Sequence, residues 1–409
     1  MMHCRFCNTP LSQVFLDLGA APASNSFLKP GDLNAPETYY PLKLFVCPEC
    51  FLVQVDEVKS SADIFSSEYV YFSSYSSTWL AHAKAYVEAT LPRLGLGPDS
   101  LVMEVASNDG YLLQYVRQAG TPALGIEPTA CTARAAREKG VETIEAFFGV
   151  ALAERLAAEG RQADLIVGNN VLAHVPDIND FVGGLRIALK PGGLVNMEFP
   201  HLYRLVESAQ FDTVYHEHFS YLSLSTVRRI FAAQGLRVFD CEELPTHGGS
   251  LRIHARAEDD PKAQDTPRLS ALLDMERAAG MLGPAYYQGF QDRVERIKAE
   301  LLGFLAEQTL ARKKVAAYGA AAKGNTLLNF CGVKAGQVAF VCDASPHKQG
   351  LFLPGSRIPV LHPEAIGRER PDYVLILPWN IKNEIMEKLA FIRQWGGRFV
   401  TPIPSPEVL

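Results

Sequence analysis

The chain has 409 residues, of which 48% are apolar and 21% are charged, and its formal net charge is −6. This is the composition of a soluble globular protein, and the length predicts about two or three domains. No apolar run reaches the roughly 20 residues that span a bilayer, and the N-terminus lacks a secretory signal pattern. No stretch longer than residues 312–314 is solidly basic, which argues against nucleic-acid binding. We therefore expect a cytoplasmic protein that binds neither membranes nor nucleic acids.

Half of the eight cysteines lie within the first fifty residues, as two C-x-x-C pairs. In a reducing compartment such pairs are more typical of metal sites than of disulfides, and four thiolates match a structural Zn²⁺ site. The 39 residues between the pairs exceed the usual spacing, and the alternative is an accidental or redox pairing. The candidate ligands are Cys4, Cys7, Cys47 and Cys50.

The first part of the chain is predicted to form a small β module. Short apolar stretches at residues 14–16, 42–46 and 52–55 are broken by Pro, Gly and Asn, as in antiparallel strands joined by turns. So short a segment buries too little apolar surface to fold alone. The predicted zinc ion would therefore stabilise it.

An aromatic and serine-rich segment follows, with Tyr69 and Tyr71 near its centre. It is predicted to cross between domains, and its rings either pack one domain on the next or line a pocket. A helical pattern then begins at Trp79 and is predicted to end at Pro92, because proline breaks helices.

The rest of the chain predicts two α/β units. In the first, strand and helix patterns alternate as in a doubly wound parallel sheet, and its last two strands form an antiparallel hairpin across residues 244–250. After a long helix-permissive stretch at residues 267–312, a smaller alternation predicts a Rossmann-like domain. The predicted strands cover residues 101–105, 123–126, 165–167, 194–199, 236–242, 251–255, 315–318, 338–342, 373–377 and 399–400.

The first strand of the large sheet is followed by a turn of small residues, from Glu104 to Gly110, and Glu127 follows the second strand. Such a turn lets the backbone approach a ligand, and an acidic residue about 20 positions on can accept hydrogen bonds from ribose hydroxyls. This arrangement resembles the S-adenosylmethionine site of class I methyltransferases, although Ala106 and Asn108 stand where that family usually has glycines. Both residues can still form the turn, since alanine is small and asparagine tolerates positive φ.

Two further motifs of the same family follow in order. The strand pattern at residues 164–169 ends in Asn169, which the resemblance puts near the methionyl end of the cofactor, and residues 190–193 resemble the turn before the fifth strand. The alternative, a dehydrogenase-type dinucleotide fold, lacks its Gly-x-Gly-x-x-Gly signature here.

A cluster of histidines suggests acid–base chemistry. His216 and His218 flank Glu217, with Tyr215 before them and His174 at the end of the fourth strand pattern. A histidine can abstract a proton near neutral pH, and a carboxylate beside it can orient the ring. A metal site is less well supported because a close third ligand is missing. For any single histidine, a buried or helix-capping role is the alternative.

In the C-terminal unit, Tyr318 ends a strand and an alanine-rich turn leads into a helix that carries Lys323. Backbone amides at such a helix start can hold an anion, with the lysine as counter-charge. The alternatives are a purely structural turn and a degenerate dinucleotide site.

Taken over its whole length, the chain resembles the sugar-nucleotide C-methyltransferases, typified by the C-3′-methyltransferases of dTDP-keto-deoxysugars. The resemblance implies a zinc-binding module at residues 1–62, a methyltransferase domain at 63–258 and a C-terminal Rossmann-like domain at 259–409 that binds the sugar nucleotide. It implies zinc and S-adenosylmethionine as cofactors and a monomer or small homo-oligomer.

The resemblance also implies roles for individual residues. His218 matches the catalytic base, and His216 stands where relatives often carry aspartate. Glu104, Ala106, Asn108, Gly110, Glu127 and Asn169 match the cofactor site. The remaining matches are Glu217, Tyr215, His174 and either Tyr69 or Tyr71 around the base, His247 and Gly248 near the sugar, and Lys323 and Asn325 near the diphosphate.

The expected reaction is removal of a proton beside a ketone, followed by transfer of a methyl group to that carbon. An enzyme base and hydrogen-bond donors to the enolate oxygen are needed, and the histidine, tyrosine and glutamate residues offer both. Two alternatives remain at this stage: an O- or N-methyltransferase, and a zinc-containing scaffold protein with a degenerate methyltransferase fold.

Overall fold

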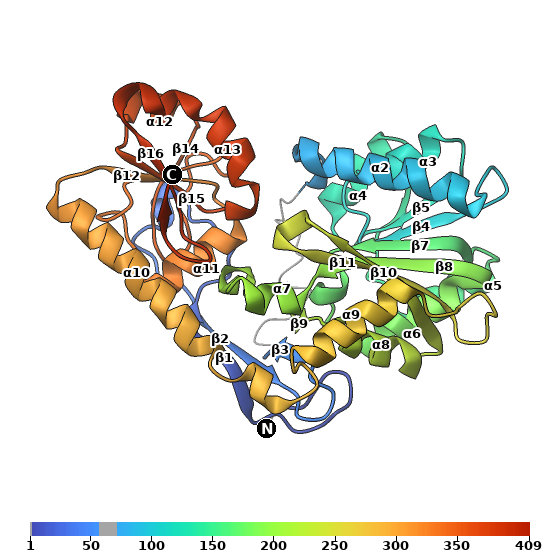
Figure 1. Ribbon diagram of the computed structural model, residues 1–409. Coiled ribbons are helices and arrows are strands. Elements are labelled where there is room, and N and C mark those ends of the chain that lie inside the picture. The colour runs from blue at the N-terminus through green and yellow to red at the C-terminus, as the bar shows by residue number, and fades with distance from the viewer. Residues whose placement is uncertain (1, 57–71) are drawn as a thin grey trace.

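The computed structural model describes residues 2–56 and 72–409. Figure 1 shows two lobes that diverge from a small sheet at their base, with the long helix α10 (Phe290–Leu310) running along one lobe. The described strands form three sheets, one four-stranded, one seven-stranded and one six-stranded. This arrangement confirms the predicted α/β class, with a doubly wound sheet flanked by a small β module and a Rossmann-like unit.

The small sheet joins the N-terminal part to the large lobe. Its first three strands are antiparallel, as predicted: β1 (Gln13–Ala21), β2 (Tyr40–Val46) and β3 (Val53–Val55). Its fourth strand, β9 (Ser220–Tyr221), comes from the middle of the chain and pairs with β3. The module therefore takes one strand from the part of the sequence that carries the predicted base.

The seven-stranded sheet has the order β10-β11-β8-β7-β4-β5-β6. Strands β8 to β6 in this order are parallel, and β11 runs antiparallel to both β8 and β10. The sequence missed β6, a three-residue edge strand that is too short and polar to give an apolar run. The bounds are β4 (Val102–Val105), β5 (Ala123–Ile126), β6 (Glu142–Ile144), β7 (Ala163–Asn169), β8 (Leu189–Pro200), β10 (Leu236–Leu244) and β11 (Ser250–Ala257).

Helices cover both faces of this sheet (Figure 1). The prediction that Pro92 ends the first of them is wrong, because α2 continues to Leu94 and is capped by Gly95 at φ 64°. Proline in a last turn removes one backbone hydrogen bond and leaves the rest of the helix intact. The helices are α2 (Ser77–Leu94), α3 (Leu113–Gln118), α4 (Ala130–Glu138), α5 (Val150–Ala158), α6 (Ile178–Ala188), α7 (Leu202–Glu207), α8 (Leu224–Ala233) and α9 (Pro267–Ala278).

The C-terminal sheet has the order β14-β13-β12-β15-β16-β17, and its strands are parallel except for the last. The helix α11 (Ala322–Cys331) follows β12 through the alanine-rich turn. The remaining elements are β12 (Val315–Tyr318), β13 (Val341–Cys342), β14 (Val360–Leu361), β15 (Tyr373–Ile376), β16 (Arg398–Thr401), β17 (Glu407–Val408), α12 (Ala365–Glu369) and α13 (Lys382–Lys388).

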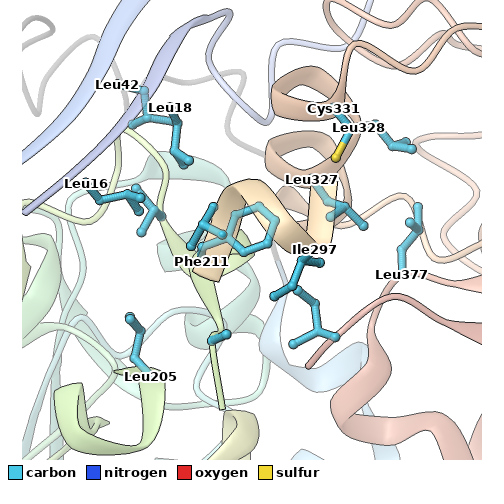
Figure 2. Close-up of a cluster of buried hydrophobic side chains, with 14 of the residues drawn as sticks. Leu16, Leu18, Leu42, Leu205, Phe211, Ile297, Leu327, Leu328, Cys331 and Leu377 are labelled. Atoms are coloured by element: carbon cyan, nitrogen blue, oxygen red, sulfur yellow. The ribbon is translucent and has the colours of Figure 1, made fainter. Parts of the chain in front are cut away.

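One hydrophobic core is shared by all three parts of the chain. It contains Leu16 of β1, Leu205 of α7, Ile297 of α10 and Leu327 of α11, all of them buried (Figure 2). Phe211 lies at its centre and meets Phe330 of α11 edge to face, at 5.4 Å between ring centroids. Because these side chains come from distant segments, the small sheet, the large lobe and the C-terminal lobe pack as a single unit.

Within the part of the chain that the structure describes, no helix is both long and apolar enough to cross a bilayer.

Phe211→Ala is expected to lower the free energy of unfolding by about 3–5 kcal/mol, because a fully buried phenylalanine leaves a cavity that its neighbours fill only in part. Chemical denaturation of the full chain measures this change. Leu310→Ala, at a side chain that is 85% exposed, is the control and is expected to change stability by less than about 0.5 kcal/mol. A small effect of Phe211→Ala would contradict the shared core.

Candidate active site and zinc site

The two C-x-x-C pairs come together beside the small sheet. The four sulfur atoms lie within 4.8 Å of one another. The Sγ atoms of Cys4 and Cys50 are 3.5 Å apart, as are those of Cys7 and Cys47. Four thiolates at about 2.3 Å from one Zn²⁺ would be separated by a little under 4 Å, so the cluster fits a tetrahedral ion with all four positions filled by protein. Such a site is structural.

The cysteine cluster is tied to the strand pair β3–β9. Gln54 of β3 donates from Nε2 to Cys4 Sγ at 3.3 Å and accepts from the Arg5 backbone at 2.9 Å. Gln54 also pairs with Ser220 of β9, and the Val55 amide donates to the Phe219 carbonyl at 3.1 Å. The metal module therefore holds the chain directly after His218.

A cavity of about 410 Å³ lies at the carboxyl ends of the parallel strands of the large sheet and extends to the C-terminal lobe. Ligands of doubly wound sheets bind at this edge. Its wall includes residues from all three parts of the chain, among them Asn25, His218 and Lys323. Ten of the predicted site residues line it: Ala106, Asn108, Glu127, Asn169, His174, Tyr215, Glu217, His218, His247 and Lys323.

One half of the cavity is built on the turn after β4. Ala106, Asn108 and Gly110 all have positive φ, at 55°, 49° and 74°. Gly110 does not line the cavity, but a Cβ there would meet Val141 and Ala136 at 3.2–3.3 Å, so the position needs glycine. The departures from glycine at positions 106 and 108 therefore leave the turn intact.

Glu127 at the end of β5 holds this turn in place. Its Oε2 accepts from the Asn108 amide at 2.9 Å, and its Oε1 accepts from the Thr129 amide at 2.9 Å and the Thr132 hydroxyl at 3.1 Å. The Thr129 side chain also hydrogen-bonds Glu127, whose carboxylate lies on the cavity wall where a ribose hydroxyl can approach it. Burial raises the pKa of Glu127, against the lowering effect of these hydrogen bonds.

Other residues complete this half of the cavity. Phe147 and Phe148 lie on its wall, and Phe147 is 51% exposed although it is large and apolar. Asn169 at the end of β7 donates from Nδ2 to the Tyr111 hydroxyl at 3.1 Å. Apolar rings, a carboxylate and amide groups in this order fit the adenine, ribose and amino-acid ends of S-adenosylmethionine. When bound, that cofactor supplies an electrophilic methyl group on a sulfonium centre.

The other half contains His218, whose ring tautomer is fixed by the backbone. Its Nδ1 lies 2.9 Å from the Thr213 carbonyl, which can only accept, so Nδ1 carries the proton and Nε2 keeps a lone pair. Burial lowers the pKa of His218 well below its usual value, and the neighbouring His174 and Lys323 add to this. The ring is therefore neutral and able to accept a proton at Nε2.

Three predicted residues surround His218. The Tyr215 ring lies 4.0 Å from it between centroids, and the His174 ring meets it edge to face at 4.6 Å. Burial lowers the pKa of His174 to about 4. Glu217 accepts from Asn25 Nδ2 at 2.6 Å, a contact with the N-terminal part that the sequence did not predict. The structure thus brings the predicted acid–base residues together around one neutral imidazole.

His216 lies apart from this cluster. Its Nε2 is 3.1 Å from the Pro41 carbonyl and its ring packs edge to face on Tyr40, so it contacts the small sheet and not the cavity. The position of His216 therefore matches the alternative role given above for a single histidine, that of a buried structural residue.

The C-terminal lobe contributes two lysines to the cavity wall. Lys323 Nζ lies 5.1 Å from the centre of the Trp379 ring and donates to the His247 carbonyl at 3.4 Å. Lys348, which the sequence did not single out, donates to the Ala320 carbonyl at 2.8 Å. Burial lowers the pKa of Lys323, and the negative charge of Asp212 opposes that shift.

Four predicted residues do not line the cavity. Glu104 is fully buried at the end of β4, Gly110 lies behind its turn, and a Cβ at Gly248 would meet Trp379 at 2.7 Å. Asn325 is buried and its Nδ2 donates to the Ser24 carbonyl at 2.6 Å, which joins the C-terminal lobe to the segment that carries Asn25. Tyr69 and Tyr71 lie outside the described residues.

Several residues that line the cavity were given no role on the basis of the sequence. Lys348 could have been found from its place after β13, where a loop at the carboxyl end of a parallel strand faces the ligand edge. Asn25 carried no such signal, since it reaches the cavity only through long-range packing. The missed residues include Asn25, Trp79, Tyr111, Phe147, Phe148, Asn170 and Lys348.

Cys50→Ser is expected to reduce bound zinc well below one ion per chain and to lower the melting temperature. Activity should fall at least about tenfold, because loss of the metal releases β9 and the segment that carries His218. Zinc content is measured by atomic emission. Cys241→Ser, at a buried cysteine outside the cluster, is the control and should retain its zinc. Full activity of metal-free Cys50→Ser would contradict the structural link to His218.

Glu127→Ala is expected to weaken binding of S-adenosylhomocysteine by at least about tenfold, because the turn loses its anchor and the ribose loses an acceptor. Isothermal titration calorimetry measures the dissociation constant. Glu142→Ala, at an exposed glutamate of the neighbouring strand, should bind as the unaltered enzyme does. Equal binding by both variants would exclude this half of the cavity as the cofactor site.

The chain is similar to several known methyltransferases. The chain is 36% identical over 410 aligned positions to the C-methyltransferase NovU of Streptomyces niveus, covering 100% of this chain and 96% of that one. It is 32% identical over 96 residues to a ubiquinone biosynthesis O-methyltransferase of Bordetella avium, covering 23% of this chain and 40% of that one. A magnesium protoporphyrin IX methyltransferase structure from Synechocystis PCC 6803 aligns at 16% identity over 44% of this chain and 82% of that one, with a TM-score of 0.34.

Three family models cover most of the chain. The family described as a "putative zinc binding domain" matches residues 4–65, a methyltransferase domain matches residues 79–240, and a C-methyltransferase C-terminal domain matches residues 245–404. With the full-length relative, they show that this chain belongs to the C-methyltransferase family, as an S-adenosylmethionine-dependent enzyme whose N-terminal cysteine cluster binds zinc.

Proposed function

We propose that this enzyme methylates a carbon next to the ketone of a nucleotide-linked keto-deoxysugar, C-3′ of a dTDP-4-keto-6-deoxysugar, and so forms a branched deoxysugar. The observation that supports this most directly is the fixed tautomer of His218, whose Nε2 lone pair belongs to a cavity that also contains two lysines. A base for a carbon acid and positive groups for a diphosphate are the two features that such a substrate needs.

His218 removes the proton in this proposal. The C–H electron pair forms the C=C bond of the enolate, the carbonyl π pair moves onto the oxygen, and the proton passes to Nε2. The enolate carbon then attacks the methyl group in line, and the sulfonium sulfur keeps the electron pair of the broken bond. The carbonyl of Thr213 accepts from Nδ1–H throughout and stabilises the imidazolium that forms.

Tyr215 is proposed to stabilise the enolate oxygen. Its ring adjoins His218, and a hydroxyl can donate to developing negative charge in a site with little water. His174 is proposed to hold His218 in place instead, because its ring lies edge to face on that of His218 and the single N–H of its neutral form is bonded to the Glu217 backbone. Glu217, which is held by Asn25, is proposed to orient this segment.

The active-site role of Tyr69 or Tyr71 stays a prediction, as do the domain boundaries at residues 62 and 258.

Lys323 and Lys348 are proposed to bind the diphosphate. Both line the cavity next to Ala321 and Ala322, where the backbone amides of the α11 start are available to an anion. His247 faces the same space and is proposed to contact the sugar. Asn325, in contrast, is proposed to act by holding the Ser24 segment, since its side chain is already bonded there.

Substrate binding also strengthens the base. In the free enzyme the positive charge of Lys323 helps to keep the pKa of His218 low. A diphosphate beside Lys323 cancels that charge, so the pKa of His218 rises toward the range in which a general base works best. Proton abstraction is therefore favoured only after the sugar nucleotide is in place.

The test is solvent exchange without methyl donor. The enzyme is incubated in D₂O with a dTDP-4-keto-6-deoxysugar, and NMR records deuterium at C-3′ and C-5′. His218→Ala is expected to slow exchange by at least about 100-fold, the usual contribution of a general base. His216→Ala, whose ring contacts the small sheet, should retain exchange once its folding is confirmed by circular dichroism.

Two outcomes would overturn the proposal. Exchange that survives in His218→Ala would remove His218 as the base. Methylation of the sugar by the unaltered enzyme with no C–H exchange would favour O- or N-methylation, which needs no carbon acid.

The pH dependence follows from the direction of these shifts. The base acts when neutral, so activity falls as pH drops through the pKa of His218. Because that pKa lies well below 6.5 in the free enzyme and rises when substrate binds, the acidic limb of kcat should lie at higher pH than that of kcat/KM. Steady-state profiles from pH 4 to pH 8, about the range over which histidines titrate, measure both limbs. Coincident limbs would exclude this coupling.

A further inference from the structure

A fully buried carboxylate lies behind the cavity, at the end of β8. Glu198 is 0% exposed, and its neighbours along the strand, Met197 and Phe199, are buried apolar residues. A charge in such a place is costly unless several donors satisfy it. Glu198 does not line the cavity, so its role is not contact with a ligand.

Three side chains satisfy Glu198. Its Oε2 accepts from Arg252 Nη2 at 2.8 Å and lies 2.9 Å from His82 Nε2, and its Oε1 accepts from the Thr246 hydroxyl at 2.9 Å. Hydrogen bonds from His82 and the charge of Arg252 hold the pKa of Glu198 below its usual range, against the effect of burial. The carboxylate is therefore ionised, and its hydrogen bond to Thr246 is charge-assisted.

Thr246 is the first residue of the turn that presents His247. This short turn of helix, η5 (Thr246–Gly248), joins β10 to β11, and His247 within it has φ 54° and ψ 19°. A residue with a side chain seldom adopts this left-handed conformation without support. The support comes from Thr246, whose carbonyl accepts from the Gly249 amide at 2.9 Å and the Ser250 hydroxyl at 3.0 Å while its side chain is held by Glu198.

The His247 ring also packs against Trp79, which in turn contacts a partner of Glu198. Trp79 meets that ring edge to face at 5.2 Å, and Trp79 stacks on His82, the second partner of Glu198, at 4.9 Å. Asn170 Nδ2 donates to His247 Nε2 at 3.0 Å, so the ring proton is on Nδ1. One carboxylate thus fixes both the backbone that carries the ring and the aromatic wall against which the ring lies.

We propose that Glu198 is a positioning residue, which binds Thr246 and His82 so that His247 faces the sugar nucleotide in a single orientation. This inference rests on the proposed function, in which His247 contacts the substrate. A buried charge pair adds little stability compared with apolar residues of similar size. The benefit of Glu198 is therefore the geometry of the turn, and removing the Thr246 hydroxyl tests that geometry without breaking the pair with Arg252.

Thr246→Val tests the link because it removes the donated hydroxyl and keeps the shape of the side chain. The KM for the sugar nucleotide is expected to rise about tenfold, as for loss of one hydrogen bond to a charged group, with kcat and the dissociation constant of S-adenosylhomocysteine changing less than about twofold. Thr246→Ser keeps the hydroxyl and should restore the original KM. Thr143→Val, at a buried threonine of β6 outside the cavity, is the matched control for loss of a hydroxyl.

A second measurement reports the turn without any substrate. In the full-length enzyme labelled with ¹³C-histidine, the His247 signal is assigned from His247→Gln and followed against pH. Burial and the charges of Lys323 and His82 hold the pKa of His247 at about 4, and Glu198 opposes them. In Thr246→Val, which keeps the charge of Glu198, the released ring should gain solvent, and its pKa should move toward 6.5.

The outcomes separate this inference from the proposed function. If Thr246→Val matches Thr143→Val in KM and in the titration, or if Thr246→Ser fails to restore KM, Glu198 is not a positioning residue. If the unaltered enzyme neither exchanges nor methylates the keto-sugar, the proposed substrate is wrong, and the His247 titration alone decides whether Glu198 holds the turn. An unmoved titration in Thr246→Val overturns the inference in either case.

Discussion

The hydrogen bond from His218 Nδ1 to the Thr213 carbonyl is the interaction on which the rest of the site depends, because it decides which ring nitrogen can take a proton. Both partners belong to one segment, residues 211–221, and each end of that segment is fixed by a different part of the chain. Phe211 is buried in the core shared with the C-terminal lobe, and Ser220 pairs with β3 of the metal module. Zinc, the small sheet and the shared core thus act together on one imidazole.

This arrangement explains why the cavity is built from three parts. A class I methyltransferase sheet by itself offers a cofactor site at its carboxyl edge, which the turn around Glu127 forms here. Asn25 from the N-terminal part and Lys323 from the C-terminal lobe close the other half. The net charge of −6 therefore says little about binding an anion, since positive groups are concentrated where the third part meets the second.

Much of the fold could be predicted from local sequence patterns, because apolar runs and turn residues specify β4, β5, β7 and the C-terminal alternation. Two local predictions were wrong because the sequence signal was weak. The strand β6 was not predicted because it is short and half polar, and α2 was predicted to end at Pro92 although proline removes only one hydrogen bond at a helix end. The site followed the same division. Residues in motifs, such as Glu127 and His218, were found, while Asn25 and Lys348 reach the cavity through contacts between segments far apart in sequence. Asn325 was predicted from its place in a motif to bind the substrate, but its side chain instead donates a hydrogen bond to the Ser24 carbonyl, which the motif did not predict.

Three histidines of the cavity, His174, His218 and His247, have pKa values that burial moves below the usual range. A set of neutral imidazoles beside a lysine avoids the repulsion that three positive rings would create, and it leaves each ring with one donor and one acceptor. The acceptor on His218 suits proton abstraction. Burial makes His218 a weak base, and in the proposed function an anionic substrate raises its pKa by neutralising Lys323. On that proposal, proton abstraction is limited to substrates that carry the diphosphate.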